Sequence, residues 1–178
     1  MNDLLPQSCL ILEIPEAEAA VGQHRKTLDT SARLGIPAHF TVLFPFMSPD
    51  QIDMTILTRL KHLFGSIEAF DFRLAHTAWF GDDVLWLAPE HPDPIRALTT
   101  LVHRSFPDFP PFEGKFADVI PHLTIAHGCD RTRMKAAEQA VERRLPVKGH
   151  ADKVTLMTQI EPASKWTTKA HFPLCPTS

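Results

Sequence analysis

Short apolar runs and amphipathic stretches alternate along this chain, which is the pattern of a mixed α and β fold. Runs with β-branched and aromatic residues, bounded by proline, glycine or aspartate, predict strands. Stretches with apolar residues every three or four positions predict helices. The strands are expected at 8–14, 41–46, 70–74, 84–88, 123–126, 154–160 and 166–174. The helices are expected at 15–34, 48–65, 92–106 and 131–145.

Turn and capping residues support several of these boundaries. Ser48 followed by Pro49 predicts a helix start, because serine caps free N–H groups and proline fits the first helical position. Gly65 ends that helix. The turn residues 81–83 separate two strands, which predicts an antiparallel hairpin. No linker or low-complexity segment divides the chain, so 1–178 is expected to form one domain of two lobes.

Composition and charge narrow the classes of partner. Hydrophobic residues make up 44% of the chain and charged residues 22%, both typical of a soluble globular protein. No apolar run is long enough to span a bilayer, and the start lacks the basic region of a secretory signal. We therefore expect a cytoplasmic protein and take it as a monomer. The formal net charge of −3 argues against tight, nonspecific binding of long duplexes, which needs a broad basic surface.

Cysteine and histidine spacing predicts no metal site. Cys9, Cys129 and Cys175 are far apart and form no Cys-x-x-Cys pair. They are expected to be reduced thiols rather than a disulfide framework or a thiolate zinc site. The histidines lack the clustered spacing of zinc ligands, and no glycine-rich phosphate loop of the Walker type occurs. The prediction is that the protein uses no metal and no cofactor.

Two tetrapeptides share a His-apolar-Thr-apolar pattern, and a proline-containing segment precedes each. The first, HFTV, begins at His39, and the second, HLTI, begins at His122. Successive side chains of a strand point to opposite faces, so the histidine and threonine of each motif share one face. The apolar residues pack behind them. Each tetrapeptide therefore presents two polar side chains on an apolar backing.

Two imidazoles and two hydroxyls suit the cleavage of a phosphodiester. One group must take a proton from the nucleophile, and another must give one to the leaving oxygen. His39 and His122 can do both, because an imidazole pKa of about 6.5 leaves both forms accessible near neutral pH. The hydroxyls of Thr41 and Thr124 can donate to the nonbridging phosphate oxygens. The alternative is that both histidines are ordinary residues of structural strands; one motif alone favours that interpretation, whereas the matched pair favours catalysis.

The strings GIPAHFTVLFPF and FADVIPHLTIAHG resemble bacterial members of the two-histidine phosphoesterase superfamily, which includes 2'-5' RNA ligases and cyclic phosphodiesterases. The resemblance implies an α+β fold in which two antiparallel sheets, related by a pseudo-twofold axis, face a central cleft with helices outside. It implies a metal-independent enzyme acting on a 2',3'-cyclic phosphate or a 2'-5' linkage of an RNA end or nucleotide. By this analogy His122 activates water and His39 protonates the leaving oxygen.

The second motif departs from many relatives, which carry an arginine shortly after it. In this chain His127 stands there, and it could replace that cation only when protonated. An unbroken strand would turn His127 away from His122. Phe112 and Phe116 precede the second motif and are candidates to stack on a base, although packing is the more common role of such rings. The candidate substrate-binding residues are therefore Thr41, Thr124, His127, Phe112 and Phe116.

Two further functions stay open from the sequence. A noncatalytic module that binds an RNA end or a nucleotide could keep the same polar side chains and hold phosphate without turning it over. A reversible 2'-5' RNA ligase would run the same chemistry toward bond formation. Looking for product across a panel of substrates separates these functions.

Overall fold

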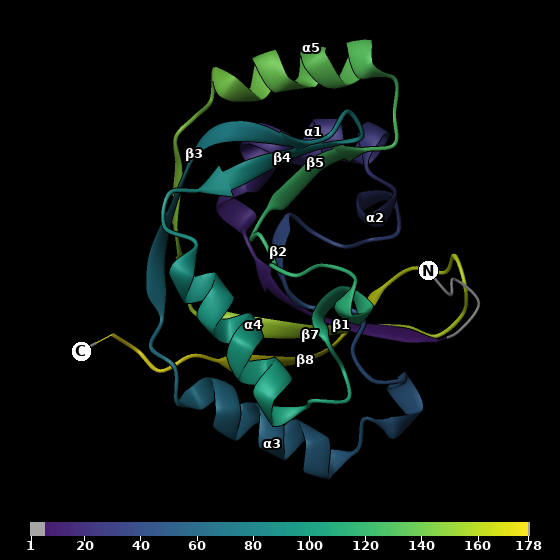
Figure 1. The fold of residues 1–178 in the computed structure, drawn as a ribbon, viewed down its shortest axis with the longest axis vertical. Coiled ribbons are helices and arrows are strands. Elements are labelled where there is room, and N and C mark those ends of the chain that lie inside the picture. The colour runs from purple at the N-terminus through teal and green to yellow at the C-terminus, as the bar shows by residue number, and fades with distance from the viewer. Residues whose placement is uncertain (1–5, 178) are drawn as a thin grey trace.

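Two four-stranded antiparallel sheets with helices around them make up residues 6–177, which the computed structural model describes (Figure 1). The first sheet has the strand order β2-β1-β7-β8 and the second β5-β4-β3-β6. The strands are β1 (Gln7–Glu13), β2 (His39–Leu43), β3 (Phe70–Phe80), β4 (Val84–Pro89), β5 (Leu123–His127), β6 (Val147–Ala151), β7 (Lys153–Gln159) and β8 (Thr167–Pro173). The helices are α1 (Glu18–Leu28), α2 (Thr30–Arg33), α3 (Met54–Gly65), α4 (Asp93–Ser105) and α5 (Arg131–Glu142), with 3-10 turns η1 (Pro15–Ala17), η2 (Pro49–Gln51) and η3 (Pro111–Gly114).

The α+β class with two antiparallel sheets is confirmed, as is the hairpin of β3 and β4. The sequence pattern missed β6. Only Val147 and Ala151, at the two ends of this strand, are buried. Such a short strand with a polar middle lacks the apolar alternation that sequence reasoning needs.

Two predicted helices begin or end at the wrong residue. The helix expected at 15–34 stops at Leu28, because Asp29 is extended and its carboxylate accepts the N–H of Ser31. At Ser48-Pro49 the predicted start holds only for the 3-10 turn η2, and the α-helix begins at Met54, where the Asp53 carboxylate caps it. In both places an aspartate side chain satisfies free helical N–H groups and so sets the start of the next helix.

The helix that precedes each motif packs against the motif strand of the other sheet. α1 leads toward β2 in the chain but lies against β5, and α4 leads toward β5 but lies against β2. α3 covers β8, and α5 lies over β3 and α1 (Figure 1). A continuous core reaches both sheets, with Phe40 of β2 meeting Phe72 of β3 edge-on at 6.3 Å between ring centroids. This crossed packing holds the two motif strands together.

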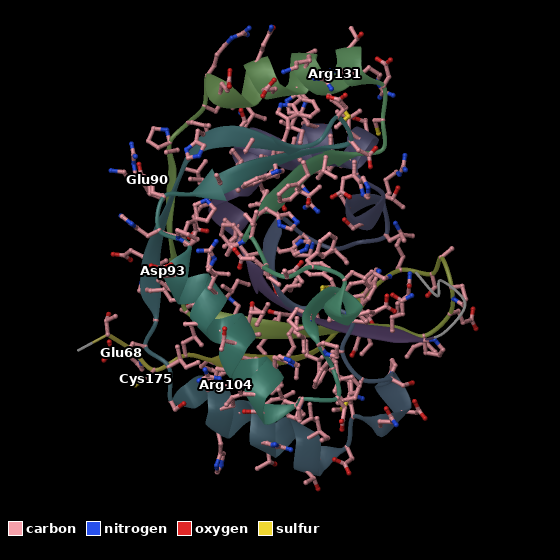
Figure 2. The ribbon with its side chains drawn as sticks, in the orientation of Figure 1. Glu68, Glu90, Asp93, Arg104, Arg131 and Cys175 are labelled. Atoms are coloured by element: carbon pink, nitrogen blue, oxygen red, sulfur yellow. The ribbon has the colours of Figure 1, made fainter. Side chains whose placement is uncertain are left out.

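The C-terminal segment returns to the start of β3. Glu68 and Cys175 form an isolated parallel bridge, and their labels lie side by side at one edge of the molecule (Figure 2). All three cysteines are unpaired, and burial raises the pKa of the Cys9 thiol to about 12. On length and hydropathy, none of the helices within residues 6–177 could span a bilayer.

Candidate active site

The two motifs carry the same backbone irregularity in the two sheets. In β2 the register with β1 skips Val42, and in β5 the register with β4 skips Ile125. Each β-bulge thus falls on the fourth residue of its motif. Bulges re-aim side chains and are frequent beside active sites. The repeated bulge supports the interpretation of two equivalent halves.

Both motif histidines are held by a backbone carbonyl two residues earlier. Nδ1 of His39 lies 2.7 Å from the Pro37 carbonyl oxygen, and Nδ1 of His122 lies 2.7 Å from that of Ile120. A carbonyl oxygen only accepts, so Nδ1 carries the proton and donates it. Nε2 is then the nitrogen left for chemistry on each ring. The segment before each motif therefore sets both tautomer and ring orientation.

The two imidazoles lie at the junction of the sheets. β2 and β5 pack against one another although they belong to different sheets. The imidazoles also interact electrostatically, since a charge on His122 lowers the pKa of His39. Thr41 and Thr124 are half-buried on the same strand faces as their histidines. The hydrogen bonds found among residues 6–177 include none from either threonine hydroxyl, so both hydroxyls are available to a ligand.

The imidazole of each motif is hard to protonate. Burial and then the positive charge of Arg25 lower the pKa of His39 to about 4, against the hydrogen bond to Pro37 and the Asp29 carboxylate, which raise it. Burial also lowers the pKa of His122, and the hydrogen bond to Ile120 opposes that effect. No cationic side chain contributes to the lowering of the His122 pKa. Both rings are therefore neutral near pH 7 in the free protein.

We expect acid to destabilise the protein partly through His39. The folded pKa of about 4 lies below the ordinary value of 6.5, so the unfolded chain binds more protons between these pH values. Stability is full above pH 6.5 and falls by about 2–3 kcal/mol from this group as the pH drops through 4. Urea unfolding at pH 7.5 and 4.5 should show a smaller acid loss in His39→Gln than in the unsubstituted protein. His24→Gln, outside the site, should keep the full loss, and equal losses in all three proteins would contradict the expectation.

A buried arginine on α1 connects the two motifs. Arg25 is 2% exposed, and its Nη2 donates to the Asp29 carboxylate at 2.8 Å. Its Nε donates to the Thr124 carbonyl oxygen at 3.1 Å, and its Nη2 also donates to the Ile36 carbonyl oxygen at 3.3 Å. Thr124 belongs to the second motif and Ile36 to the approach of the first. One guanidinium therefore holds both motifs. The helical spacing of Arg25 from Val21 and Leu28 is compatible with burial, but nothing in the sequence indicates its partners, because a helical arginine is usually exposed.

A cavity of about 660 Å³ opens beside the first motif. Thr41 and His127 line it, together with the aromatic rings of Phe44 and Trp166, which meet edge-on at 6.3 Å between centroids. Its apolar wall comes from Cys9, Ile11, Ile36 and neighbouring residues. This combination of aromatic faces with a few polar groups suits a nucleoside. Sequence reasoning assigned Trp166 only to a strand and so missed this wall.

His127 faces this cavity, whereas an unbroken strand would turn it away. Trp86 pairs with Thr124, and Val84 pairs with His127. Paired residues of antiparallel strands share a face, and residues two apart on one strand do too, so His127 lies on the Thr124 face. The bulge at Ile125 causes this change. Nε2 of His127 lies 3.2 Å from the Asp83 carboxylate.

A family model described as the 2'-5' RNA ligase superfamily matches residues 14–162, which include both motifs. The chain belongs to the 2'-5' RNA ligase superfamily. No curated protein sequence matches it. Among solved structures, TT0787 of Thermus thermophilus has a TM-score of 0.62 and 17% identity over 97% of this chain and 100% of its own. The apo form of E. coli LigT has a TM-score of 0.61 and 17% identity over 96% and 99% of the two chains. At these identities the likeness shows the fold, and with the family model it places the protein among the two-histidine phosphoesterases.

Phe112 and Phe116 do not share the cavity of Thr41 in this superfamily member. They line a second cavity of about 420 Å³ with Phe44 and Phe46. The N–H of Phe112 donates to the Phe44 carbonyl oxygen at 2.6 Å, so the segment before the second motif is fastened to the residue after β2. Phe112 and Glu113 both have positive φ. Such backbone is costly and occurs more often at functional sites than elsewhere. Neither cavity is lined by His39 or His122.

Two aromatic residues support His122 and were not predicted for the site. The His122 ring lies edge-on to Phe80 and Trp86, with centroid distances of 5.0 and 5.9 Å. Trp86 is also the strand partner of Thr124, and its buried indole N–H has no hydrogen-bond partner within 6–177. The sequence placed Trp86 on the β-hairpin, whereas Phe80 lies beyond the first predicted strand at 70–74, which the structure extends to Phe80. Nothing in the sequence could place the hairpin beside the motif. In the same part of the chain, no group of three or more His, Cys, Asp or Glu could hold a metal ion.

Proposed function

We propose that this protein is a phosphoesterase that hydrolyses a 2',3'-cyclic phosphate or a 2'-5' phosphodiester of a nucleotide or RNA end without a metal ion. The observation that carries the proposal is the matched pair of imidazoles, each with Nδ1 bonded to a carbonyl and Nε2 left for chemistry. In-line displacement at phosphorus needs proton transfer on two opposite sides. Thr41 and Thr124 supply hydroxyl donors for the nonbridging oxygens. The two sheets act together as one catalytic domain.

The charges around the site favour different roles for the two histidines. Arg25 disfavours a proton on His39, whereas no cation opposes one on His122. In our proposal, Nε2 of His39 takes a proton from water as the water oxygen bonds to phosphorus. Nε2 of protonated His122 gives its proton to the ribose oxygen as the P–O bond breaks, which leaves a phosphate monoester from a cyclic substrate. These roles are the reverse of those that the family resemblance implies.

The cavity beside Thr41 is the proposed place of the nucleoside. Phe44 and Trp166 offer ring faces to a base, and Thr41 joins this cavity to the first motif. Base stacking on aromatic side chains is common in proteins that bind single-stranded RNA. E. coli LigT, which shares the fold, has been solved with NADP+, 3'-AMP and ATP. A nucleotide substrate for this protein is consistent with those ligands.

We expect turnover of one or more members of a panel of 2',3'-cyclic nucleotides and 2'-5' dinucleotides, with EDTA making no difference. Because the free enzyme must hold His39 neutral and His122 protonated, and burial lowers the pKa of both rings, kcat/KM should be bell-shaped with its maximum on the acid side of pH 6.5. Chromatography of products over this pH range checks both points. Binding of the panel without any product would favour the noncatalytic module, and joining of RNA ends would favour the ligase. Loss of turnover with EDTA would contradict the metal-independent mechanism.

A further inference from the structure

A third cavity, of about 440 Å³, lies between α4 and the segment that leads to the second motif. Arg96, His103 and Arg104 of α4 form one side, and Asp118 stands on the other. Figure 2 labels Asp93 at the start of α4 and Arg104 toward its end, so this surface, the α4 groove, follows the helix. None of these residues belongs to the catalytic motifs.

Two polar atoms in the α4 groove are buried without a partner. Nε of Arg96 and Nδ1 of His103 make no hydrogen bond to any part of the chain between 6 and 177. The other guanidinium nitrogens of Arg96 lie 3.8 Å from the Asp93 carboxylate and 3.6 Å from that of Asp118, too far for hydrogen bonds. Buried polar atoms are normally satisfied, so these two show that the chain's own groups leave this side of the groove incomplete. The Arg96 side chain as a whole is 40% exposed, and its exposed guanidinium atoms are the ones that a ligand in the groove would meet.

Cationic side chains gather along the lining of the α4 groove, although the whole chain has a net charge of −3. Arg96, His103 and Arg104 line it with a single acid, Asp118, while Asp93, which also lies near Arg96, does not line the groove. Arg104 is exposed and forms no ion pair with the rest of the described chain. Arginine presents several donors in a planar fork that matches phosphate oxygens. The hydroxyl of exposed Thr100 adds a neutral donor on the same side.

Shared aromatic residues join the α4 groove to the catalytic side of the molecule. Phe116 is 62% exposed and lines both the α4 groove and the cavity that contains Phe44. Phe44 in turn lines the cavity that contains Thr41. The three cavities therefore follow one another from the first motif to α4. A single-stranded RNA whose end lies at the motifs can stack its bases on these rings and place a phosphate from further along its backbone in the groove.

We propose that the α4 groove, built by Arg96, His103 and Arg104, is a second phosphate-binding site. Its ligand is a phosphate group, either free or within a strand whose end lies at the motifs. The strand form of the proposal, in which the phosphate belongs to a bound RNA strand, rests on the proposed function. The free form, in which the ligand is a separate phosphate ion, does not. A binding experiment and a kinetic experiment distinguish the two.

NMR of the His103 imidazole tests binding directly. The double variant His39→Ala/His122→Ala, labelled with ¹⁵N, is titrated with inorganic phosphate and with a six-residue oligoribonucleotide, against sodium chloride at equal ionic strength. We expect a saturable shift of the His103 signal, assigned through His103→Gln, that Arg104→Gln weakens at least 5-fold in Kd. A shift with phosphate alone identifies a free anion, and a shift at lower concentration with the oligonucleotide identifies a strand. No saturable shift with either probe overturns the proposal.

Kinetics test the strand form through the ratio of kcat/KM on two substrates, which a loss of folded protein would lower equally. We measure kcat/KM on a 2',3'-cyclic mononucleotide and on an oligoribonucleotide with the same cyclic end. In Arg104→Gln the ratio of oligonucleotide to mononucleotide should fall about 5- to 10-fold, and its dependence on salt should weaken by about one unit of slope. Arg133→Gln, an equal charge change on exposed α5, should leave the ratio unchanged. An unchanged ratio in Arg104→Gln, or an equal fall in Arg133→Gln, overturns the strand form. Absence of turnover on both substrates counts against the proposed function alone. In that case the NMR titration decides whether the α4 groove binds phosphate.

Discussion

His39→Ala and His122→Ala should each lower kcat/KM on a 2',3'-cyclic nucleotide by about 10²- to 10⁴-fold, because each removes one of two proton transfers. Folding should change little. Each ring is half-buried and makes its one hydrogen bond with a neighbouring backbone carbonyl. Initial rates together with urea unfolding separate catalysis from stability. His24→Ala on α1 is the matched control and should keep its rate, whereas robust turnover by either motif variant would remove the basis of the proposed mechanism.

An activated leaving group should distinguish the two roles. p-Nitrophenolate leaves without a proton, so a nucleoside p-nitrophenyl phosphate needs a base but no acid. His122→Ala should recover most of its lost rate on this substrate, while His39→Ala should not. Recovery in His39→Ala instead would restore the roles that the family resemblance implies.

Arg25→Met should cost about 3–5 kcal/mol of unfolding free energy, because it leaves the Asp29 carboxylate buried without its partner. It also removes the donor to the Thr124 and Ile36 carbonyls. Urea unfolding measures the loss. Arg143→Met, at the exposed end of α5, is the matched control and should change stability by less than about 0.5 kcal/mol. The double variant Arg25→Met/Asp29→Leu should lose less than the sum of its single variants, since no lone charge stays buried.

A second readout of Arg25→Met does not depend on stability. The Arg25 charge lowers the pKa of His39, so its removal should raise that pKa toward the ordinary value. NMR titration of the His39 imidazole under folded conditions measures the shift. If the pKa of His39 stayed near 4 in a folded Arg25→Met protein, burial alone would account for it, and Arg25 would be a purely structural link.

Local patterns predicted most of the strands and the main helices, but not every boundary. β-branched and aromatic runs marked β1, β7 and β8, and the 81–83 turn marked the hairpin. They failed for β6, whose middle is polar, and at Asp29, which ends α1 by extending the backbone. β6 depends on its pairing with β3, a contact between distant parts of the chain that outweighs a weak local preference. At Asp29 the contacts are local but involve side chains, since the carboxylate accepts from Ser31 and from Arg25, four residues earlier.

The candidate site likewise contains residues that the sequence predicted and residues whose place only the structure shows. The motif residues His39, Thr41, His122 and Thr124 were predicted from their repeated pattern, and strand alternation predicted the face that each pair shares. Phe112 and Phe116 were chosen by their place before the second motif, yet they line a different cavity from Thr41. His127 joins the Thr41 cavity only because a bulge at Ile125 shifts the alternation. A bulge is a property of strand pairing, so no pattern within one strand reveals it.

The sequence by itself determined which residues are candidates for the proposed chemistry, because a histidine and a threonine two positions apart on a strand share one face, and the pattern occurs twice. The tertiary structure alone decided how that chemistry is arranged. It crossed α1 and α4 onto the opposite motif strands, buried Arg25 between them and set Phe80 and Trp86 against His122. It also placed the cations of α4 along one groove. These features depend on contacts between residues far apart in the chain, and the free energy of such contacts is absent from any local pattern.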